Sequence, residues 1–214
     1  MYIQITNRCN ALCPHCSLSC TKKGSDMTRD NFIKALTIVR DSGDCIVLGG
    51  GEPTIHPLFW DFLGLALSFD DDSTLWLATN GSQVETSIRL AALAKRGTLG
   101  VRLSHDKYHP KIDFRVIRAF EESSFASGGE NDLRDKTPWE YGLIKAGRAR
   151  KTAVDPKDRR KRECACPDLF ISPRGSIFAC GCRKTKFGTV SNPQIPPGHN
   201  FNDNICFESK MTGL

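Results

Sequence analysis

The chain has 214 residues, ten cysteines and a formal net charge of +6, and this length suits one sizeable domain with a small addition. No run of 18 apolar residues occurs, which excludes an ordinary membrane-spanning helix. Met1 leads directly into a strand-like segment without a secretion signal, so we expect a cytoplasmic protein, in which grouped cysteines indicate metal binding or catalysis rather than disulfides.

Strand-like and helix-like segments alternate over the first 124 residues. Thr28 is the expected N-cap of the first helix. The alternation predicts a parallel sheet with helices outside, and about five or six units are too few for a closed eight-stranded barrel. We therefore predict an α/β fold in which residues 1–150 form a partial, open (β/α)5–6 TIM-like barrel. The expected strands are 2–6, 45–48, 74–80 and 99–104, and the expected helices are 31–43, 58–67, 85–97 and 113–123.

The remaining segments are less regular. Residues 123–136 suggest no clear element, and residues 141–147 read as one further strand. A charged linker follows, and residues 169–180 predict a β-hairpin around a turn with Pro173 and Gly175. Residues after Val190 are rich in turn formers and are expected to be a loop. We expect residues 151–214 to form a small cysteine-rich β-hairpin domain.

Motifs that can carry chemistry follow the expected strands, where parallel α/β folds place their active sites. A C-x3-C-x2-C motif (Cys9, Cys13, Cys16) follows the first strand, GGGEP (49–53) the second, TNG (79–81) the third, and Ser104 with Asp106 the fourth. Zinc is one interpretation of the cysteines, with Cys20 or His15 as fourth ligand. The other is an iron–sulfur cluster held by three thiolates, which leaves one iron open.

The segment CNALCPHC (9–16) resembles the signature of the radical S-adenosylmethionine (SAM) superfamily, and the GGE, TNG and S-x-D motifs match that family in order. The resemblance covers residues 1–150. It implies that Cys9, Cys13 and Cys16 bind a [4Fe–4S] cluster and that SAM chelates the fourth iron. It also implies that an electron from a donor such as flavodoxin or ferredoxin cleaves SAM to methionine and a 5′-deoxyadenosyl radical, which abstracts a substrate hydrogen.

The resemblance assigns cofactor-binding roles to several residues. Gly50 and Gly51 let the backbone approach the methionine moiety, and Glu52 pairs with its ammonium group. Asn80 either contacts the ligand or caps a turn. Ser104 and Asp106 either hydrogen-bond the ribose hydroxyls or belong to an ordinary polar loop.

Three residues beyond the fourth strand are candidates for catalysis, because they would face the mouth of the site: His105, Tyr108 and His109. A solvated loop is the alternative. His15 is expected on the adenosine side. Cys45, in the second strand, is expected to be a small core residue.

A second cysteine group lies near the C-terminus and consists of Cys164, Cys166, Cys180, Cys182 and Cys206. It frames the expected hairpin, and this region resembles a "twitch" domain, which implies an auxiliary [4Fe–4S] cluster with zinc as the alternative. Cys206 is a fifth thiol in this region, and residues 147–149 (GRA) resemble a last barrel strand. The expected ligands are Cys164, Cys166, Cys180 and Cys182.

The substrate is harder to predict. Residues 145–186 contain 13 Lys or Arg and 4 Asp or Glu, which either compensates the charge of a thiolate-bound cluster or attracts an anionic partner such as DNA.

Our best expectation is a modified nucleotide or DNA base. An example is the isomerisation of glycinyl-thymidine in phage thymidine hypermodification, which would take place in the host cytoplasm. Peptide modification is the alternative. Activation of a glycyl-radical enzyme, or a zinc-stabilised nucleic-acid-binding module, is less favoured. The enzyme would be of the isomerase or oxidoreductase type.

Overall fold

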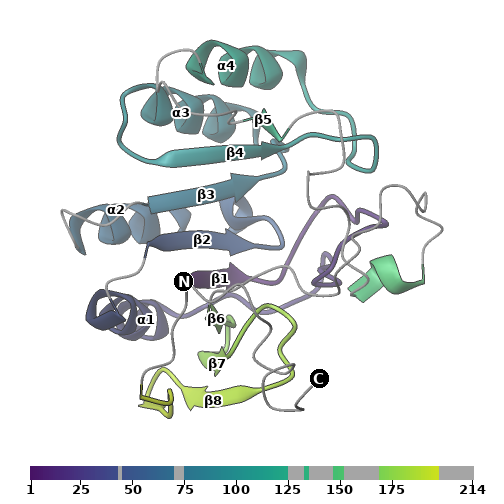
Figure 1. Ribbon diagram of the computed structural model, residues 1–214. Helices are drawn as coiled ribbons and strands as arrows, with labels where there is room; N and C mark the ends of the chain where they lie inside the picture. Colours follow the sequence, from purple (N-terminus) through teal and green to yellow (C-terminus); the bar gives the residue numbers. More distant parts are fainter. Residues whose placement is uncertain (43–44, 70–74, 125–132, 135–146, 152–168, 198–214) are drawn as a thin grey trace.

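The computed structural model describes residues 1–42, 45–69, 75–124, 133–134, 147–151 and 169–197. Strands in these residues form one sheet in the order β5-β4-β3-β2-β1-β6-β7-β8-β9 (Figure 1). Pairs from β5 across to β6 are parallel, and pairs from β6 to β9 are antiparallel. The strands are β1 (Tyr2–Thr6), β2 (Ile46–Gly50), β3 (Leu75–Thr79), β4 (Gly100–Ser104), β5 (Leu133–Arg134), β6 (Phe170–Ile171), β7 (Ser176–Phe178), β8 (Lys186–Thr189) and β9 (Asn192–Pro193).

Each of the strands β1 to β4 is followed by an α-helix, which confirms the predicted alternation. Apolar faces of these helices pack on the sheet in one core, where Phe32 and Phe62 are fully buried and stack with ring centroids 4.2 Å apart. Burial of each such ring stabilises the fold by about 2 kcal/mol. The helices are α1 (Arg29–Ser42), α2 (Phe59–Phe69), α3 (Val84–Lys95) and α4 (Phe114–Ser124), with short 3-10 helices η1 (Pro53–Ile55) and η2 (Gly147–Arg150).

Local signals fix the helix ends. The Thr28 hydroxyl accepts a hydrogen bond from the Asn31 amide at 3.3 Å, which confirms Thr28 as the N-cap of α1. Gly97 has a φ of +74° just beyond α3, a conformation that favours glycine. Among the described helices, none is long and apolar enough to cross a membrane.

The C-terminal strands extend the sheet beyond β1. Strand β6 pairs in parallel with β1, with Tyr2 opposite Phe170 and their rings stacked at 5.3 Å. Strands β6 and β7 form the predicted antiparallel pair, and Gly175 in the turn has a φ of +75°. The boundary at residue 151 stays a prediction, because residues 152–168 lie outside the described part of the chain.

Four predictions were wrong in detail. The segment 123–136 contains β5, a strand too short to show a periodic pattern. Residues 147–149 form η2 rather than a strand, because Gly147 has a φ of +55° that a strand does not allow. Two residues of the expected loop after Val190 pair with β8 as β9. Cys45 is exposed, since β2 begins only at Ile46.

Candidate active site

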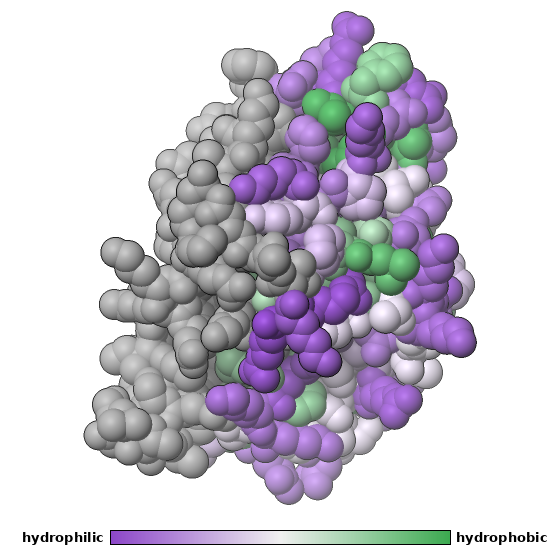
Figure 2. All heavy atoms as spheres, turned by 90° about the vertical axis from the view of Figure 1, so that its right-hand side faces the viewer, coloured by the Kyte–Doolittle hydropathy of each residue, from purple (hydrophilic) through white to green (hydrophobic). Residues whose placement is uncertain are grey.

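The loops after β1 to β4 meet at the carboxyl edge of the sheet, on the right of Figure 1. Figure 2 looks onto this edge and shows that its described surface is mainly hydrophilic. The segment after β1, which we call the cysteine loop (residues 9–20), folds back on itself. The Cys9 amide donates to the Thr21 carbonyl at 2.6 Å, and the Cys16 amide donates to the Cys13 carbonyl at 3.2 Å. The sheet edge therefore carries the three-cysteine motif at the predicted place.

The thiols of the cysteine loop lie close enough to influence one another. Cys9 and Cys13 are buried and Cys16 is partly buried. The pKa of the Cys13 thiol is raised to about 12. Burial is the largest cause, and the negative charges of the neighbouring Cys9 and Cys16 add to it. A metal centre would supply the positive charge that stabilises such thiolates. Three neighbouring thiols on one short loop thus fit a cluster that is held by three cysteines.

Cys20 is a fourth thiol in the same loop. Its side chain is 3% exposed, and the Gln4 amide nitrogen Nε2 lies 3.7 Å from its Sγ. A hydrogen bond from Cys20 lowers the pKa of Cys16 to about 5, although burial of Cys16 opposes this shift. The sequence offered Cys20 only as an alternative zinc ligand; the structure shows that it contacts Cys16.

The short helix η2 packs against the cysteine loop, although the two segments are far apart in the sequence. Arg148 donates from its backbone amide to the Cys16 carbonyl at 3.0 Å, from Nε to the Cys13 carbonyl at 3.0 Å, and from Nη1 to the Cys20 carbonyl at 2.6 Å. Gly147 has no β-carbon, and one placed there would collide with the carbonyls of Cys16 and Ser17. Sequence reasoning missed Arg148, because only the motif GRA marked this segment.

The GGGEP motif packs directly against the start of the cysteine loop. The Gly51 amide donates to the Thr6 carbonyl at 2.7 Å, and the Glu52 amide donates to the Arg8 carbonyl at 2.9 Å. A β-carbon on Gly51 would collide with the Arg8 carbonyl and lie 2.8 Å from Cys9 Cβ. The glycines therefore allow two loops to touch. That Gly50 and Gly51 also approach the methionine moiety of SAM stays a prediction.

Glu52 joins the ends of β2 and β3. Its side chain is 1% exposed. Oε1 accepts from the Thr54 amide at 3.2 Å and hydroxyl at 2.6 Å and from the Thr79 hydroxyl at 2.8 Å, while Oε2 accepts from the Asn80 amide at 2.6 Å. Burial raises the pKa of Glu52, and these hydrogen bonds oppose the rise. Glu52 therefore links the segments that follow β2 and β3, and its pairing with the SAM ammonium group stays a prediction.

Asn80 caps the turn after β3, and its contact with SAM stays a prediction. Its Oδ1 accepts from the Ser82 amide at 2.9 Å, which caps the turn. Its Nδ2 lies 3.8 Å from Cys9 Sγ and donates to Asn10 Oδ1 at 3.0 Å. A cavity of about 250 Å³ opens beside it, lined by Asn10, Asn80, Lys111 and their neighbours. Asn80 therefore contacts the cysteine loop directly.

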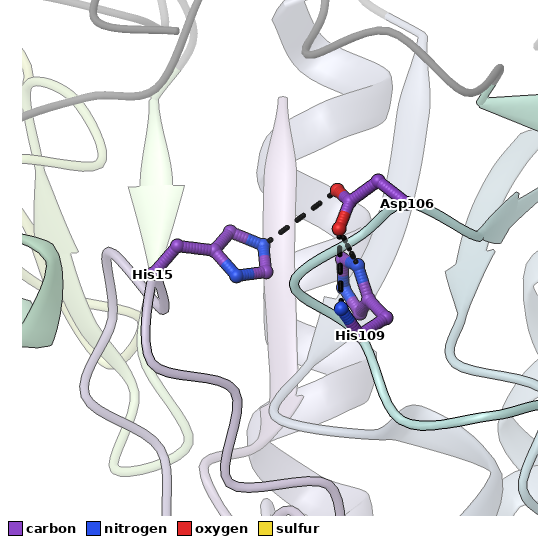
Figure 3. A group of neighbouring side chains, drawn as sticks. All are labelled: His15, Asp106 and His109. Atoms are coloured by element: carbon purple, nitrogen blue, oxygen red, sulfur yellow. Dashed lines mark hydrogen bonds and ion pairs between the residues drawn. The ribbon is translucent and has the colours of Figure 1, made fainter. Parts of the chain in front are cut away.

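His15 of the cysteine loop meets Asp106 and His109, which follow β4, in a cluster of two imidazoles and one carboxylate (Figure 3). Polar atoms of His15, Asp106 and His109 all lie within 4.8 Å of one another. Asp106 accepts from the Tyr108 amide at 2.8 Å, and its carboxylate oxygens lie 2.8 Å from His109 Nδ1 and 3.9 Å from His15 Nε2. We call this group the histidine cluster. Ser104 and His105 are partly buried beside it but are not part of it.

Charges inside the histidine cluster are well defined. Burial raises the pKa of Asp106, but hydrogen bonds from His109 and the Tyr108 amide outweigh it, so the net shift is downward. Burial also lowers the pKa of His15, and His109 lowers it further. The Tyr108 ring lies 5.3 Å from His15. The group therefore presents an ionised carboxylate between imidazoles that can donate or accept hydrogen bonds.

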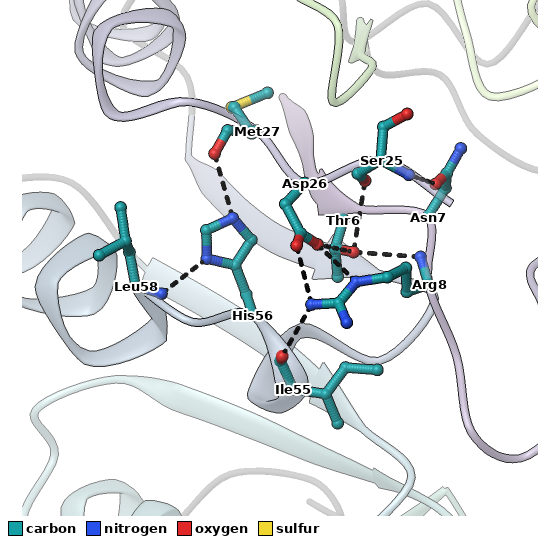
Figure 4. A network of polar contacts seen from close by, with 9 residues as sticks. All are labelled: Thr6, Asn7, Arg8, Ser25, Asp26, Met27, Ile55, His56 and Leu58. Carbon is teal, nitrogen blue, oxygen red and sulfur yellow. Dashed lines mark hydrogen bonds and ion pairs between the residues drawn. The ribbon is translucent and has the colours of Figure 1, made fainter. Parts of the chain in front are cut away.

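A second polar network lies next to the start of the cysteine loop (Figure 4). Arg8, the residue before Cys9, forms a two-point ion pair with Asp26 through Nε at 2.9 Å and Nη2 at 2.8 Å. Arg8 also donates to the Ile55 carbonyl at 3.2 Å. His56, which is 4% exposed, lies 3.1 Å from the Met27 carbonyl. This network ties the start of the cysteine loop to the segment after GGGEP.

Only part of the second cysteine group is described. Cys180 and Cys182 lie just after β7 with their sulfur atoms 3.3 Å apart. Cys164, Cys166 and Cys206 lie outside the described residues. The predicted auxiliary site therefore stays a prediction.

The chain belongs to the radical SAM superfamily, because the model of that family matches residues 3–125, more than half of the chain. The match spans β1 to α4 and all the motifs of the carboxyl edge. It confirms the resemblance inferred from CNALCPHC, and this family implies a [4Fe–4S] cluster.

Curated relatives match about half of the chain. The bovine (Bos taurus) "Molybdenum cofactor biosynthesis protein 1" is 30% identical over 122 residues, which are 54% of this chain and 19% of that protein. The "PqqA peptide cyclase" of Streptomyces rochei is 33% identical over 107 residues, which are 49% of this chain and 29% of that protein. The chain thus matches less than a third of either relative.

Solved structures share the fold. "BtrN in complex with AdoMet and 2-DOIA" aligns with a TM-score of 0.59 at 14% identity, over 89% of this chain and 77% of that one. "Native anSMEcpe with bound AdoMet" aligns with a TM-score of 0.56 at 15% identity, over 95% of this chain and 80% of that one. The likeness confirms the predicted partial barrel.

Proposed function

We propose that this protein cleaves SAM reductively at a [4Fe–4S] cluster held by Cys9, Cys13 and Cys16, and that the resulting 5′-deoxyadenosyl group removes a hydrogen atom from a substrate. The observation that carries the proposal is the placement of three thiols, which influence one another's pKa, on one loop at the carboxyl edge of the barrel. The two aligned structures are titled as complexes with AdoMet, which supports the same ligand here. An external donor such as flavodoxin or ferredoxin would supply the electron.

The residues around the cysteine loop suit the polar parts of SAM. Asp106 is an ionised carboxylate that can accept hydrogen bonds from ribose hydroxyls, and its Oδ2 faces His15 across 3.9 Å. Asn80 and the backbone at Gly50 and Gly51 lie next to Cys9, on the side proposed for the methionine moiety. Ser104 would assist Asp106. Glu52 would orient this side, because it fixes the position of the Asn80 amide.

Proton transfer is the role we propose for the histidine cluster. His109 Nδ1 lies 2.8 Å from the Asp106 carboxylate, so its other ring nitrogen can act toward a substrate as a general acid or base. Tyr108 shares this loop and can contribute a hydroxyl. His105 is the third candidate in the same turn.

We favour a modified nucleotide or DNA base as substrate. Exposed lysines surround the carboxyl edge: Lys22 and Lys23 beside the cysteine loop, and Lys107 and Lys111 beyond β4. Such cations attract phosphates, and the described surface of this edge is mainly hydrophilic (Figure 2). Isomerisation of glycinyl-thymidine suits this chemistry: a hydrogen leaves the glycyl α-carbon, the bond to thymidine moves from the glycyl nitrogen to that carbon, and a hydrogen atom is returned to the nitrogen. A peptide is the second candidate, because the chain resembles a protein named as a peptide cyclase.

Cys180 and Cys182, together with Cys164 and Cys166, are proposed to hold an auxiliary [4Fe–4S] cluster, with zinc as the alternative. Metal analysis separates these outcomes, since two [4Fe–4S] clusters require about eight irons per chain and one requires about four.

The test is an anaerobic turnover assay with dithionite and SAM, in which 5′-deoxyadenosine is measured by liquid chromatography. The wild-type protein is expected to form the nucleoside, and Cys13→Ala is expected to form none. Formation of the nucleoside by Cys13→Ala would refute the assignment. Adding glycinyl-thymidine or a candidate peptide in parallel identifies the substrate class: the correct class increases 5′-deoxyadenosine formation and yields a new chromatographic product.

A further inference from the structure

Arg148 reaches the cysteine loop from a segment more than 120 residues away in sequence. Its side chain contacts the carbonyls of Cys13 and Cys20 at 3.0 and 2.6 Å. Its backbone amide contacts the carbonyl of Cys16 at 3.0 Å. One residue therefore holds the middle and the end of the loop at three points, and two of these points belong to expected cluster ligands.

These three contacts of Arg148 depend on the close approach of η2 to the cysteine loop. Gly147 precedes Arg148 at a φ of +55°, and its α-carbon lies against the carbonyls of Cys16 and Ser17. These contacts fix both the backbone and the side chain of Arg148 relative to the loop. The planar guanidinium donates in two directions at once, which an ammonium group on a flexible stem does less well.

The guanidinium also brings a permanent positive charge to the loop. Arginine does not lose its proton in proteins, and the Cys20 carbonyl holds Nη1 at 2.6 Å. Adding an electron to a cluster is easier beside a positive charge, since charge and hydrogen bonding around the sulfurs set the reduction potential.

We propose that Arg148 is a positioning residue that fixes the backbone of the cysteine loop and raises the reduction potential of the cluster bound there. The inference rests on the proposed function, because it needs the cluster. It assigns to η2 a role that neither the family match, which ends at residue 125, nor the sequence motifs supply.

The experiment compares wild type with Arg148→Met, Arg148→Lys and the control Arg150→Met, which removes an exposed arginine from the same short helix. Each protein is reconstituted anaerobically with iron and sulfide. The cluster whose electron paramagnetic resonance (EPR) signal responds to SAM is then titrated to obtain its reduction potential. Hydrogen exchange of residues 9–20 reports the mobility of the loop.

Arg148→Met is expected to load at least twofold less of the SAM-responsive cluster, with a more negative potential and faster exchange in the cysteine loop. Arg148→Lys keeps the charge but cannot make the forked contacts, so we expect a potential close to wild type with exchange that is still faster. Arg150→Met is expected to match wild type in all three measurements.

The inference is overturned if Arg148→Met matches wild type in loading, potential and loop exchange. Should Arg148→Met fail to fold, Arg148→Lys decides, because wild-type exchange in that variant would also overturn the inference. A wild-type protein without any SAM-responsive cluster would instead refute the proposed function. The two failures are therefore distinguishable.

Discussion

The two cysteine groups of this protein are supported in different ways. The cysteine loop after β1 is held by distant segments: GGGEP from the end of β2, Asn80 from β3 and Arg148 from η2. Within the described residues, Cys180 and Cys182 lie in a local turn, where the Arg183 amide donates to the Cys180 carbonyl at 3.0 Å. The geometry of the first group therefore depends on contacts with three segments that are distant in sequence, whereas the described contact of the second group is local.

Removal of single cysteines is expected to give the largest difference between the two cysteine groups. Cys13→Ala is expected to abolish the SAM-responsive cluster and 5′-deoxyadenosine formation, because two thiolates do not hold a cubane that needs three. Cys182→Ala is expected to leave that cluster in place. Iron analysis and EPR of both variants check this. Equal loss of the SAM-responsive signal in both would show that the two groups are not independent.

A smaller effect is expected from a steric clash introduced between η2 and the cysteine loop. Gly147→Ala adds a methyl group to a backbone at φ +55° and against two carbonyls, and we expect a loss of about 2 to 3 kcal/mol together with reduced cluster loading. Thermal and urea denaturation measure the free energy of unfolding.

Gly97→Ala is the matched control for this variant. Gly97 has a comparable φ of +74°, but no atom lies within 4 Å of the added methyl group. It should lose about 1 kcal/mol and keep full loading. If both variants behave alike, the contact with the loop is unimportant and only backbone strain matters.

The bridge between β2 and β3 can be tested next. Glu52→Gln replaces one acceptor oxygen by an amide nitrogen, which cannot accept from the Asn80 amide or from Thr54 and Thr79. We expect the free energy of unfolding to fall by about 1 to 3 kcal/mol, as measured by urea denaturation. Unchanged stability would mean that Glu52 is already protonated and donates one of these hydrogen bonds.

The smallest expected effect concerns Asp26 beneath the cysteine loop. Burial of Asp26 raises its pKa, but the hydrogen bonds from Arg8 and Thr6 outweigh this, so the pKa in the folded protein lies below the usual value of an aspartate. Such a group stabilises the fold above its unfolded pKa, and the contribution is lost as the pH falls through the folded pKa.

Asp26→Asn should therefore cost less than about 1 kcal/mol near neutral pH, because the pair with Arg8 is partly exposed. The difference from wild type should shrink as the pH is lowered below about 4. Denaturation at a series of pH values measures it. A difference that grows toward acid would contradict the assigned shift.

Much of the barrel could be predicted because its signals are local. Apolar periodicity marked β1 to β4 and their helices, and Thr28 and Gly97 marked helix ends. The motifs of the carboxyl edge were found because parallel strands bring their carboxyl ends together. Two-residue strands such as β5 and β9 have no period to detect, and their pairing decides them.

Long-range contacts explain what sequence reasoning missed in the site. Arg148 looked like any arginine of a basic segment, and only the fold brings it to Cys13, Cys16 and Cys20. Glu52 and Gly51 were recognised from their motif, but their contacts with Asn80 and Arg8 could not be read from spacing. Partners that are distant in sequence leave no local pattern.

The most direct test of the central claim is the EPR spectrum of the reduced wild-type protein with and without SAM. The account predicts a [4Fe–4S] signal that changes when SAM is added, in wild type and in Cys182→Ala but not in Cys13→Ala. Zinc in place of iron at the cysteine loop, or an iron signal indifferent to SAM, would contradict it.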